Sequence, residues 1–275
     1  MKFKVLFITF NIVLFLSFLT IFLLPFFILD GSFMVEFWSK NWYFGLIFIA
    51  ILAIVNGAFI SNWKMLSCLE KEDWPALSSW LEAKIIGKKR YSKRKVRLLC
   101  DSLLLLGDFT TIRALEAQLR AEKPQMLVSL AVRFCAAQLL ASDYESLHQF
   151  ASDMAKTPGA DRDWLLFYAA FSRQMAGTPE DCALEILPLA RTARDPVVTA
   201  IAAYVCGVLL VKKLPARLEE LTQAAAEAQQ RVLLKYTRNK WDSMIDESKS
   251  DMYVVILSKI IDETTLWLYG TQPKA

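Results

Sequence analysis

The sequence has 275 residues, 55% of them hydrophobic, and its 32 basic and 28 acidic side chains give a formal net charge of +4. This length suits one large domain or two small ones, and so small a charge argues against a nucleic-acid partner. Phenylalanine is concentrated before residue 60, whereas Ala, Glu, Gln and Arg dominate afterwards. The asymmetry predicts a membrane part followed by a water-soluble part.

Two long apolar segments occupy the first 63 residues. Residues 5–29 are interrupted by few polar side chains, and residues 43–63 form a second run of similar character. About 20 apolar residues suffice to cross a bilayer, so each run is long enough. The first run is too long for the core of a signal peptide and lacks a small-residue cleavage site. We therefore expect a retained transmembrane hairpin over residues 1–63.

The connection between the spans is rich in aromatic side chains, and basic residues flank the hairpin. We expect residues 30–42 to be a loop at the far membrane interface, because aromatic rings prefer the headgroup level; these rings are Phe33, Phe37, Trp38 and Trp42. Lys2 and Lys4 precede the first span, and Lys64 follows the second. The positive-inside rule then predicts that both termini are cytoplasmic, in a chain integral to a bacterial inner membrane.

One amide side chain lies in each span. Asn11 and Asn56 are at similar depth, about six or seven residues from the cytoplasmic end of the spans. A buried amide in lipid seeks a partner, and an interhelical pair contributes on the order of 1 kcal/mol. A polar pathway would need more ionisable groups than the hairpin has. We expect the two amides to pair, within an anchor rather than a transporter unless the chain oligomerises.

Beyond the spans, breaks recur at a fixed interval. An acidic residue followed by an aromatic one appears at Asp73-Trp74, Asp108-Phe109 and Asp143-Tyr144, each 35 residues after the last. Another 35 residues lead to Gly177-Thr178-Pro179, and a further break lies near 213–215. A period in this range is typical of a helical solenoid, in which each helix pair buries its apolar face against its neighbours.

The pattern resembles the tetratricopeptide repeat. In residues 93–126, Gly107-Asp108-Phe109 stands where that family has its inter-helix turn, and Pro124 where its second helix ends. The family's small first-helix residue corresponds to Cys100, Cys135, Ala170 and, shifted by two, Gly207. The usual second-helix alanine is replaced by Ile112 and Leu147. The resemblance implies an α-solenoid over about 66–238 and says almost nothing about function.

The fold class expected is therefore all-α: two transmembrane helices, a tetratricopeptide-like solenoid, and a capping helix. A helix is expected over 217–236 and a final one over 252–269, which would cover the last apolar face of the array. The expected domains are 1–63, 64–240 and 241–275. This layout is similar to that of bacterial membrane scaffolds such as the HemY-type proteins, an analogy of architecture alone.

No residue pattern proposes catalysis, a cofactor or a metal. The single histidine, His148, has no triad or metal-ligand spacing around it, and we expect it to be a surface or packing residue. Phosphate-binding and dinucleotide-binding loops are not found in the sequence. The five cysteines are far apart, which favours buried thiols in a reducing compartment. We expect no enzyme.

A basic run covers residues 84–97. Its candidates for anionic lipid headgroups are Lys88, Lys89, Arg90 and Lys93. Such contacts contribute roughly 1 kcal/mol per residue near a membrane surface. A solvated loop that merely follows the positive-inside bias remains an equal alternative.

The concave groove implied by the resemblance is the last candidate site. The positions that would line it are Arg94, Arg97, Asp101, Arg133, Trp164, Phe167, Tyr168 and Phe171. Arginines followed by aromatics are suited to an acidic, partly apolar segment of a protein partner. The alternative is that these aromatics are core between repeats.

Two functions follow from this organisation. The first is a membrane-anchored cytoplasmic scaffold or adaptor that binds an unidentified protein through the groove. The second is a structural subunit of a transport or secretion complex, assembled as a homo- or hetero-oligomer through the hairpin. The two differ in whether the groove or the hairpin carries the binding energy.

Overall fold

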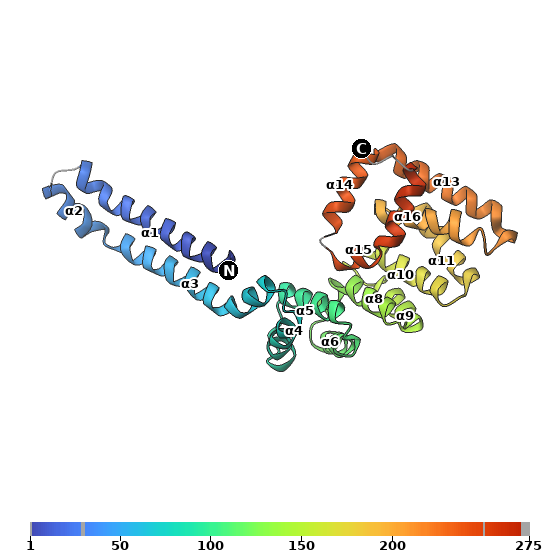
Figure 1. Cartoon of the computed structure of the whole chain (residues 1–275), viewed down its shortest axis with the longest axis horizontal. Coiled ribbons are helices and arrows are strands. Elements are labelled where there is room, and N and C mark those ends of the chain that lie inside the picture. Colours follow the sequence, from blue (N-terminus) through green and yellow to red (C-terminus); the bar gives the residue numbers. More distant parts are fainter. Residues whose placement is uncertain (1, 29–30, 250, 271–275) are drawn as a thin grey trace. The chain divides into compact units, whose positions relative to one another are not determined.

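The computed structural model describes residues 2–28, 31–249 and 251–270, and the regular elements in those ranges are all helices. The chain divides into two compact units, Met1–Lys84 and Ile85–Ala275. Most helices of both units are labelled in Figure 1. The all-α fold class, with two long apolar helices ahead of a helical body, is confirmed.

The first unit is built on a helical hairpin of α1 (Lys2–Ile28), α2 (Gly31–Asn41) and α3 (Tyr43–Glu70). Two segments, Phe3–Leu23 and Tyr43–Glu70, are long and apolar enough to cross a membrane. Helices α1 and α3 lie side by side (Figure 1), and their aromatic rings stack in two places. Ring centroids are 3.7 Å apart for Phe18 and Phe48 and 3.8 Å apart for Phe7 and Phe59.

The connection between the spans differs from the sequence expectation. Residues 31–41 form helix α2 instead of a loop. A helix pairs backbone groups within the segment itself, and an ion pair between Lys40 and Glu36 at 2.8 Å, one turn apart, supports it. Asp30, and the side chains of Phe33 and Phe37, lie outside the described residues. Trp38 contacts Phe22 of α1, with ring centroids 4.3 Å apart, and Trp42 is exposed.

Helix α3 does not stop at the expected domain boundary after residue 63. It continues unbroken to Glu70, and α4 (Trp74–Glu82) packs against it. The carboxylate of Asp73 accepts a hydrogen bond from the Ala76 amide at 3.1 Å, which caps α4. The first helix pair therefore belongs to the hairpin unit, and the division between units falls after Lys84, within the short π-helix η1 (Ala83–Gly87).

The second unit consists of helices that pack in consecutive pairs. The pairs are α5 (Lys93–Leu106) with α6 (Phe109–Glu122), α8 (Ala131–Leu140) with α9 (Tyr144–Met154), α10 (Arg162–Met175) with α11 (Pro179–Thr192), and α12 (Pro196–Tyr204) with α13 (Leu218–Lys235). Short elements intervene: α7 (Pro124–Val128), η2 (Val205–Leu210) and η3 (Pro215–Arg217). Helix α8 contacts both α5 and α10, and α10 contacts α12. The first helix of each pair therefore lies in one row, and we call these four the first helices.

The breaks at 35-residue intervals are turns of one repeated geometry. The residue before each cap has a positive φ, and these residues are Glu72, Gly107, Ser142 and Gly177. The next amide donates to a carbonyl five residues back, as from Asp108 to Leu103 at 3.0 Å and from Asp143 to Gln138 at 3.1 Å. This is the left-handed helix ending, followed directly by an N-cap. The Gly-Asp break therefore joins two helices.

The small residues that recur at the same position of each repeat lie between packed helices. Cys100, Cys135 and Ala170 are all buried, and the five cysteines are free thiols. At Gly207, an added Cβ would lie only 2.9 Å from the Cβ of Ala225 on α13. The spacing in the sequence thus marks real packing contacts.

The C-terminal cap contains three helices, α14 (Arg238–Ser248), α15 (Met252–Ile256) and α16 (Ser258–Tyr269). The single helix expected over 252–269 is broken at Leu257, which has φ −91° and ψ 8°. Helix α16 packs on α12, as a cap should, whereas α15 reaches back to α8 (Figure 1). The break lets one short segment contact a helix far from the end of the array.

Candidate functional site

A carboxylate from the C-terminal cap meets two arginines from the row of first helices. Asp251, immediately before α15, accepts a hydrogen bond from Arg97 Nη2 of α5 at 2.6 Å. Its Oδ1 also accepts from Arg133 Nη2 of α8. Arg133 is only 8% exposed, while the side chain of Asp251 is 27% exposed. One carboxylate thereby ties together α5, α8 and the cap.

A second carboxylate completes this cluster. Asp101 Oδ1 lies 3.4 Å from Arg133 Nε, and Asp101 Oδ2 lies 3.8 Å from Arg97 Nε. These contacts are ion pairs rather than well-formed hydrogen bonds, since Asp101 Oδ1 and Arg133 Nε have no hydrogen-bond partner in the described chain. Burial raises the pKa of Asp101, although Arg133 and Arg97 act in the opposite direction. Two arginines thus face two aspartates, and the formal charges balance.

Aromatic rings lie beside the charges. The ring of Tyr253, on α15, is 5.2 Å from the ring of Trp164 at an interplanar angle of 72°. The guanidinium of Arg133 lies 5.6 Å from the Tyr253 ring centroid. Such edge-to-face and cation–π contacts are favourable. Burial raises the pKa of Tyr253 to about 12, with a further contribution from Asp251. We call Arg97, Asp101, Arg133 and Trp164 the inner groove, and residues 251–256 the closing segment.

The sequence expectation of an open groove is wrong for half of its eight residues, which are buried. Trp164 is 3% exposed, and Tyr168 and Phe167 are completely buried. They pack between helices as core, which was the alternative left open. Phe171 is half-buried and stacks on Phe167, whereas Arg94 is exposed. Arg97 and Arg133 do lie together, but the chain's own Asp251 occupies them.

Tyr168 carries an unusual buried hydroxyl. Its Oη has no hydrogen-bond partner among the residues that the structure describes. Desolvation raises its pKa well above the ordinary value, with smaller contributions from Cys135 and Tyr253. A buried polar group without a partner costs stability, so this hydroxyl is a local weakness beneath the closing segment.

Sequence reasoning missed Asp251 and Tyr253. They stand at the start of a segment expected only to cap the array. No periodicity links Asp251 to an arginine 154 residues away. The available signal was an isolated acidic residue two positions before an aromatic one, next to the start of an apolar helix.

The four basic side chains expected to contact lipid headgroups are exposed, and one of them, Lys89, also forms an ion pair. Lys88, Arg90 and Lys93 are exposed. Lys89 Nζ lies 2.6 Å from Glu122 Oε1, and Tyr91 donates a hydrogen bond to the same carboxylate at 2.9 Å. Lys89 therefore ties the turn before α5 to the end of α6. Lipid contact by the other three stays a prediction.

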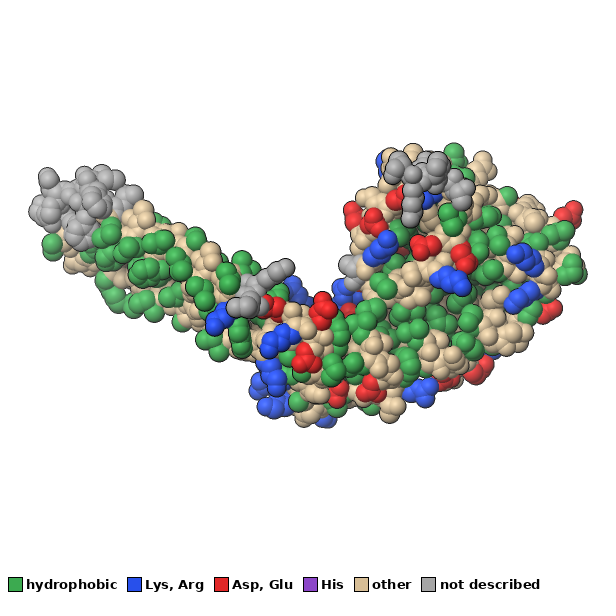
Figure 2. Space-filling view, viewed as in Figure 1, with side chains coloured by type: hydrophobic (Ala, Val, Ile, Leu, Met, Phe, Trp, Pro, Cys, Tyr) green, Lys and Arg blue, Asp and Glu red, His purple; other side chains and the backbone are tan. Residues whose placement is uncertain are grey.

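The two amides in the hairpin are joined by a hydrogen bond. Asn56 Nδ2 donates to Asn11 Oδ1 at 2.9 Å. Each side chain also donates to a carbonyl of its own helix, Asn56 to Leu52 and Asn11 to Phe7, both at 2.9 Å. The amides are thus satisfied inside the hairpin, and the surrounding surface is apolar (Figure 2).

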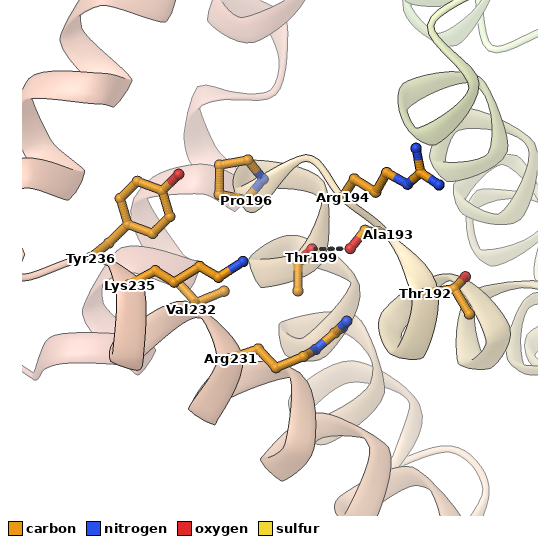
Figure 3. A pocket seen from close by; sticks show the side chains of 9 residues that line it. All are labelled: Thr192, Ala193, Arg194, Pro196, Thr199, Arg231, Val232, Lys235 and Tyr236. Atoms are coloured by element: carbon orange, nitrogen blue, oxygen red, sulfur yellow. Dashed lines mark hydrogen bonds between the residues drawn. The ribbon is translucent and has the colours of Figure 1, made fainter.

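A cavity of about 290 Å³ lies near the ends of α11 and α13 (Figure 3). Its lining includes Arg194, Arg231 and Lys235. Arg231 donates to the Ala190 carbonyl and so satisfies an acceptor left open at the end of α11. Thr199 donates to the Ala193 carbonyl at 3.2 Å. These contacts give Arg231 and Thr199 structural roles.

His148 joins three helices. Its Nε2 lies 2.8 Å from Glu185 Oε1, and its Nδ1 accepts from Arg173 Nη2 at 3.0 Å. These partners come from α11 and α10, which agrees with a packing role. Over the described ranges, no three His, Cys, Asp or Glu side chains are grouped so as to hold a metal ion.

Comparison with known proteins assigns the chain to a family. No solved structure matches it. A protein of Treponema pallidum (strain Nichols), described as an uncharacterized protein, is 30% identical over 233 residues, covering 82% of this chain and 74% of the relative. The model of the family described as uncharacterised Treponema protein matches residues 111–270, which include Arg133, Trp164 and the closing segment. The chain therefore belongs to this family.

Proposed function

We propose that this chain is a membrane-anchored cytoplasmic scaffold, in which the hairpin is the anchor and the helical body binds a partner protein. The observation that carries the proposal is the row of helices α5, α8, α10 and α12, of which the first three each end in a turn of the same geometry. Stacked helix pairs of this kind present extended surfaces rather than catalytic pockets. The described residues offer no cluster for metal catalysis either.

The repeat geometry supports a tetratricopeptide-like array. The turn residues recur every 35 positions, from Glu72 to Gly177, and the small residues Cys100, Cys135 and Ala170 recur in the same register. In such arrays the first helices line the surface that binds partner segments. The inner groove lies on those helices, which makes it the natural binding surface of this scaffold.

We infer the orientation from lysines. Lys4 precedes the first span and Lys64 lies near the end of the second, so the positive-inside rule favours cytoplasmic termini. Exposed Lys88, Arg90 and Lys93 would then be available to anionic headgroups.

A structural subunit of a transport or secretion complex is the second candidate. It is favoured by the apolar cavity of about 280 Å³ on the hairpin, lined by Phe18, Phe22, Trp38, Phe44 and Phe48 among others. A transmembrane helix of another subunit would fill such a surface. Against it, the amides of Asn11 and Asn56 are hydrogen-bonded to one another rather than offered to a partner helix.

Site-specific photocross-linking of the full chain in native membranes separates these functions. One cross-linker replaces Arg94, exposed on α5, and the other replaces Ile54, which is 69% exposed on α3. The scaffold predicts a protein adduct from position 94. Adducts to membrane proteins from position 54 alone would instead identify a complex subunit.

A further inference from the structure

We propose that the inner groove binds a partner segment in which an acidic residue is followed two positions later by an aromatic and three positions later by an aliphatic residue. The closing segment, with Asp251, Tyr253 and Val254, occupies the groove in cis and competes with that partner. The proposal rests on the scaffold function and names the surface and the chemistry of its partner.

The charges require an anionic occupant. Without Asp251, Arg97 would lose its 2.6 Å hydrogen bond and Arg133 its hydrogen bond to the same oxygen, which leaves Arg133 with the looser 3.4 Å ion pair to Asp101. Arg133 is 8% exposed, so water cannot compensate it well. Any segment that replaces the closing segment must therefore carry a carboxylate to the position of Asp251.

The rings and the aliphatic side chain set the rest of the pattern. Tyr253 lies against Trp164 and beneath the guanidinium of Arg133, and Val254 is 2% exposed. An occupant with a carboxylate alone would leave this apolar surface uncovered. Aromatic and aliphatic contacts beside a charge-assisted hydrogen bond are the features that give a peptide both affinity and register.

The closing segment is suited to release because its helical part is brief. Helix α15 has five residues, and its neighbour α14 ends at Ser248. Leu257 interrupts the helix between α15 and α16. A helix this short has little stability of its own, so its docking depends on the groove. Helix α16 packs on α12 independently of α15 and can keep the array capped.

A peptide added in trans tests the proposal. The probe is a fluorescent peptide with the sequence of residues 249–258, KSDMYVVILS, titrated onto the full chain in lipid nanodiscs. The double variant Asp251→Asn/Tyr253→Ala loses the cis contacts, so it should bind the peptide at least about tenfold more tightly than the original chain. Replacing the peptide's own aspartate by asparagine should weaken this binding about tenfold.

Matched variants identify the site. Adding Arg133→Ala to the double variant should abolish peptide binding, whereas adding Arg191→Ala, at an exposed position on α11 away from the inner groove, should leave it unchanged. Equal affinity of the original chain and the double variant would overturn the cis competition. If the asparagine peptide binds as tightly as the aspartate peptide, the proposed role of the carboxylate is wrong. If the original chain dimerises by exchanging closing segments, the occupant is a second copy, which would refute the partner segment.

Hydrogen exchange provides a test that does not depend on the folding of a variant. In the original chain, saturating peptide should accelerate exchange of amides 252–256 severalfold while leaving α10 protected. If exchange of these amides is unchanged at saturating peptide, displacement of the closing segment is refuted.

The peptide assay and the cross-linking experiment distinguish the two proposals. If the peptide binds but no protein adduct forms at position 94, the groove assignment stands and the scaffold function is refuted. If a protein adduct forms at position 94 but the peptide does not bind, the scaffold function stands and the inner groove is not its binding site.

Discussion

The carboxylate of Asp251 and the guanidinium of Arg97 lie 2.6 Å apart although 154 residues separate them in the chain. The same carboxylate binds Arg133, so the end of the helical body closes onto its beginning. The contact uses the chemistry expected of a partner segment, a carboxylate next to an aromatic ring. The groove and its first occupant are therefore encoded in one chain.

The two arginines of the cluster should differ in importance. Arg133→Ala leaves Asp101 and Asp251 near one another without their buried counter-charge, and we expect a loss of about 3 kcal/mol in the free energy of unfolding. Arg97 has a side chain 42% exposed, so Arg97→Ala should cost only about 0.5 kcal/mol. Thermal unfolding of the full chain, followed by circular dichroism, measures both. Equal losses of unfolding free energy in the two variants would refute the argument that Arg133, as the more buried arginine, matters more.

Gly207→Ala should be destabilising, contrary to the usual effect of this change in a helix. The added Cβ would meet the Cβ of Ala225 at 2.9 Å, and neither atom can rotate away. Separating η2 from α13 should cost about 2 kcal/mol. Gly57→Ala on α3 is the control, because nothing lies within 4 Å of its added Cβ. That variant should instead raise the unfolding midpoint, as alanine does in an open helical position.

Tyr168→Phe should stabilise the helical body by about 1 kcal/mol, since it removes a buried hydroxyl that has no partner in the described part of the chain. The matched control is Tyr204→Phe. Tyr204 donates to Glu263 at 3.0 Å, so its loss should destabilise by about 1 kcal/mol. Unfolding midpoints that move in the same direction for both variants would contradict this reading of Tyr168.

The cap at Asp108 should make a pH-dependent contribution. Hydrogen bonds from Thr111 hold the pKa of Asp108 below its usual value. Its stabilisation is therefore complete above the pKa of the unfolded chain and is lost as the pH falls through the lower, folded pKa. Asp108→Ala should cost about 1 kcal/mol at neutral pH, and the difference from the original chain should shrink in acid. Denaturant unfolding at several pH values tests this, and a constant difference would exclude the ionised cap.

Much of the helical body could be predicted because its signals are local. The turn after α5 needs a left-handed residue and a capping carboxylate next to each other, and Gly107-Asp108 supplies both within two positions. The small residue Cys100 reports a close helix approach by its register in the repeat. Asn11 and Asn56 could be matched by depth, on the expectation that both segments cross one apolar layer.

The inner groove could be predicted only in part. Its arginines followed from the register of the first helices, but the burial of Trp164 and Tyr168 depended on neighbouring helices that no spacing identifies. Similarly, the break at Leu257 has no glycine or proline to signal it. These features arise where packing outweighs local preference.

The sequence by itself determined the repeated turns, the register of the helix pairs and two helices long and apolar enough to span a membrane, because each depends on residues close together in the chain. Only the tertiary structure decided that the groove is closed by residues 251–256. That closure joins charges 154 residues apart and packs Tyr253 against Trp164, and contacts between such distant parts of the chain depend on packing that no local pattern signals.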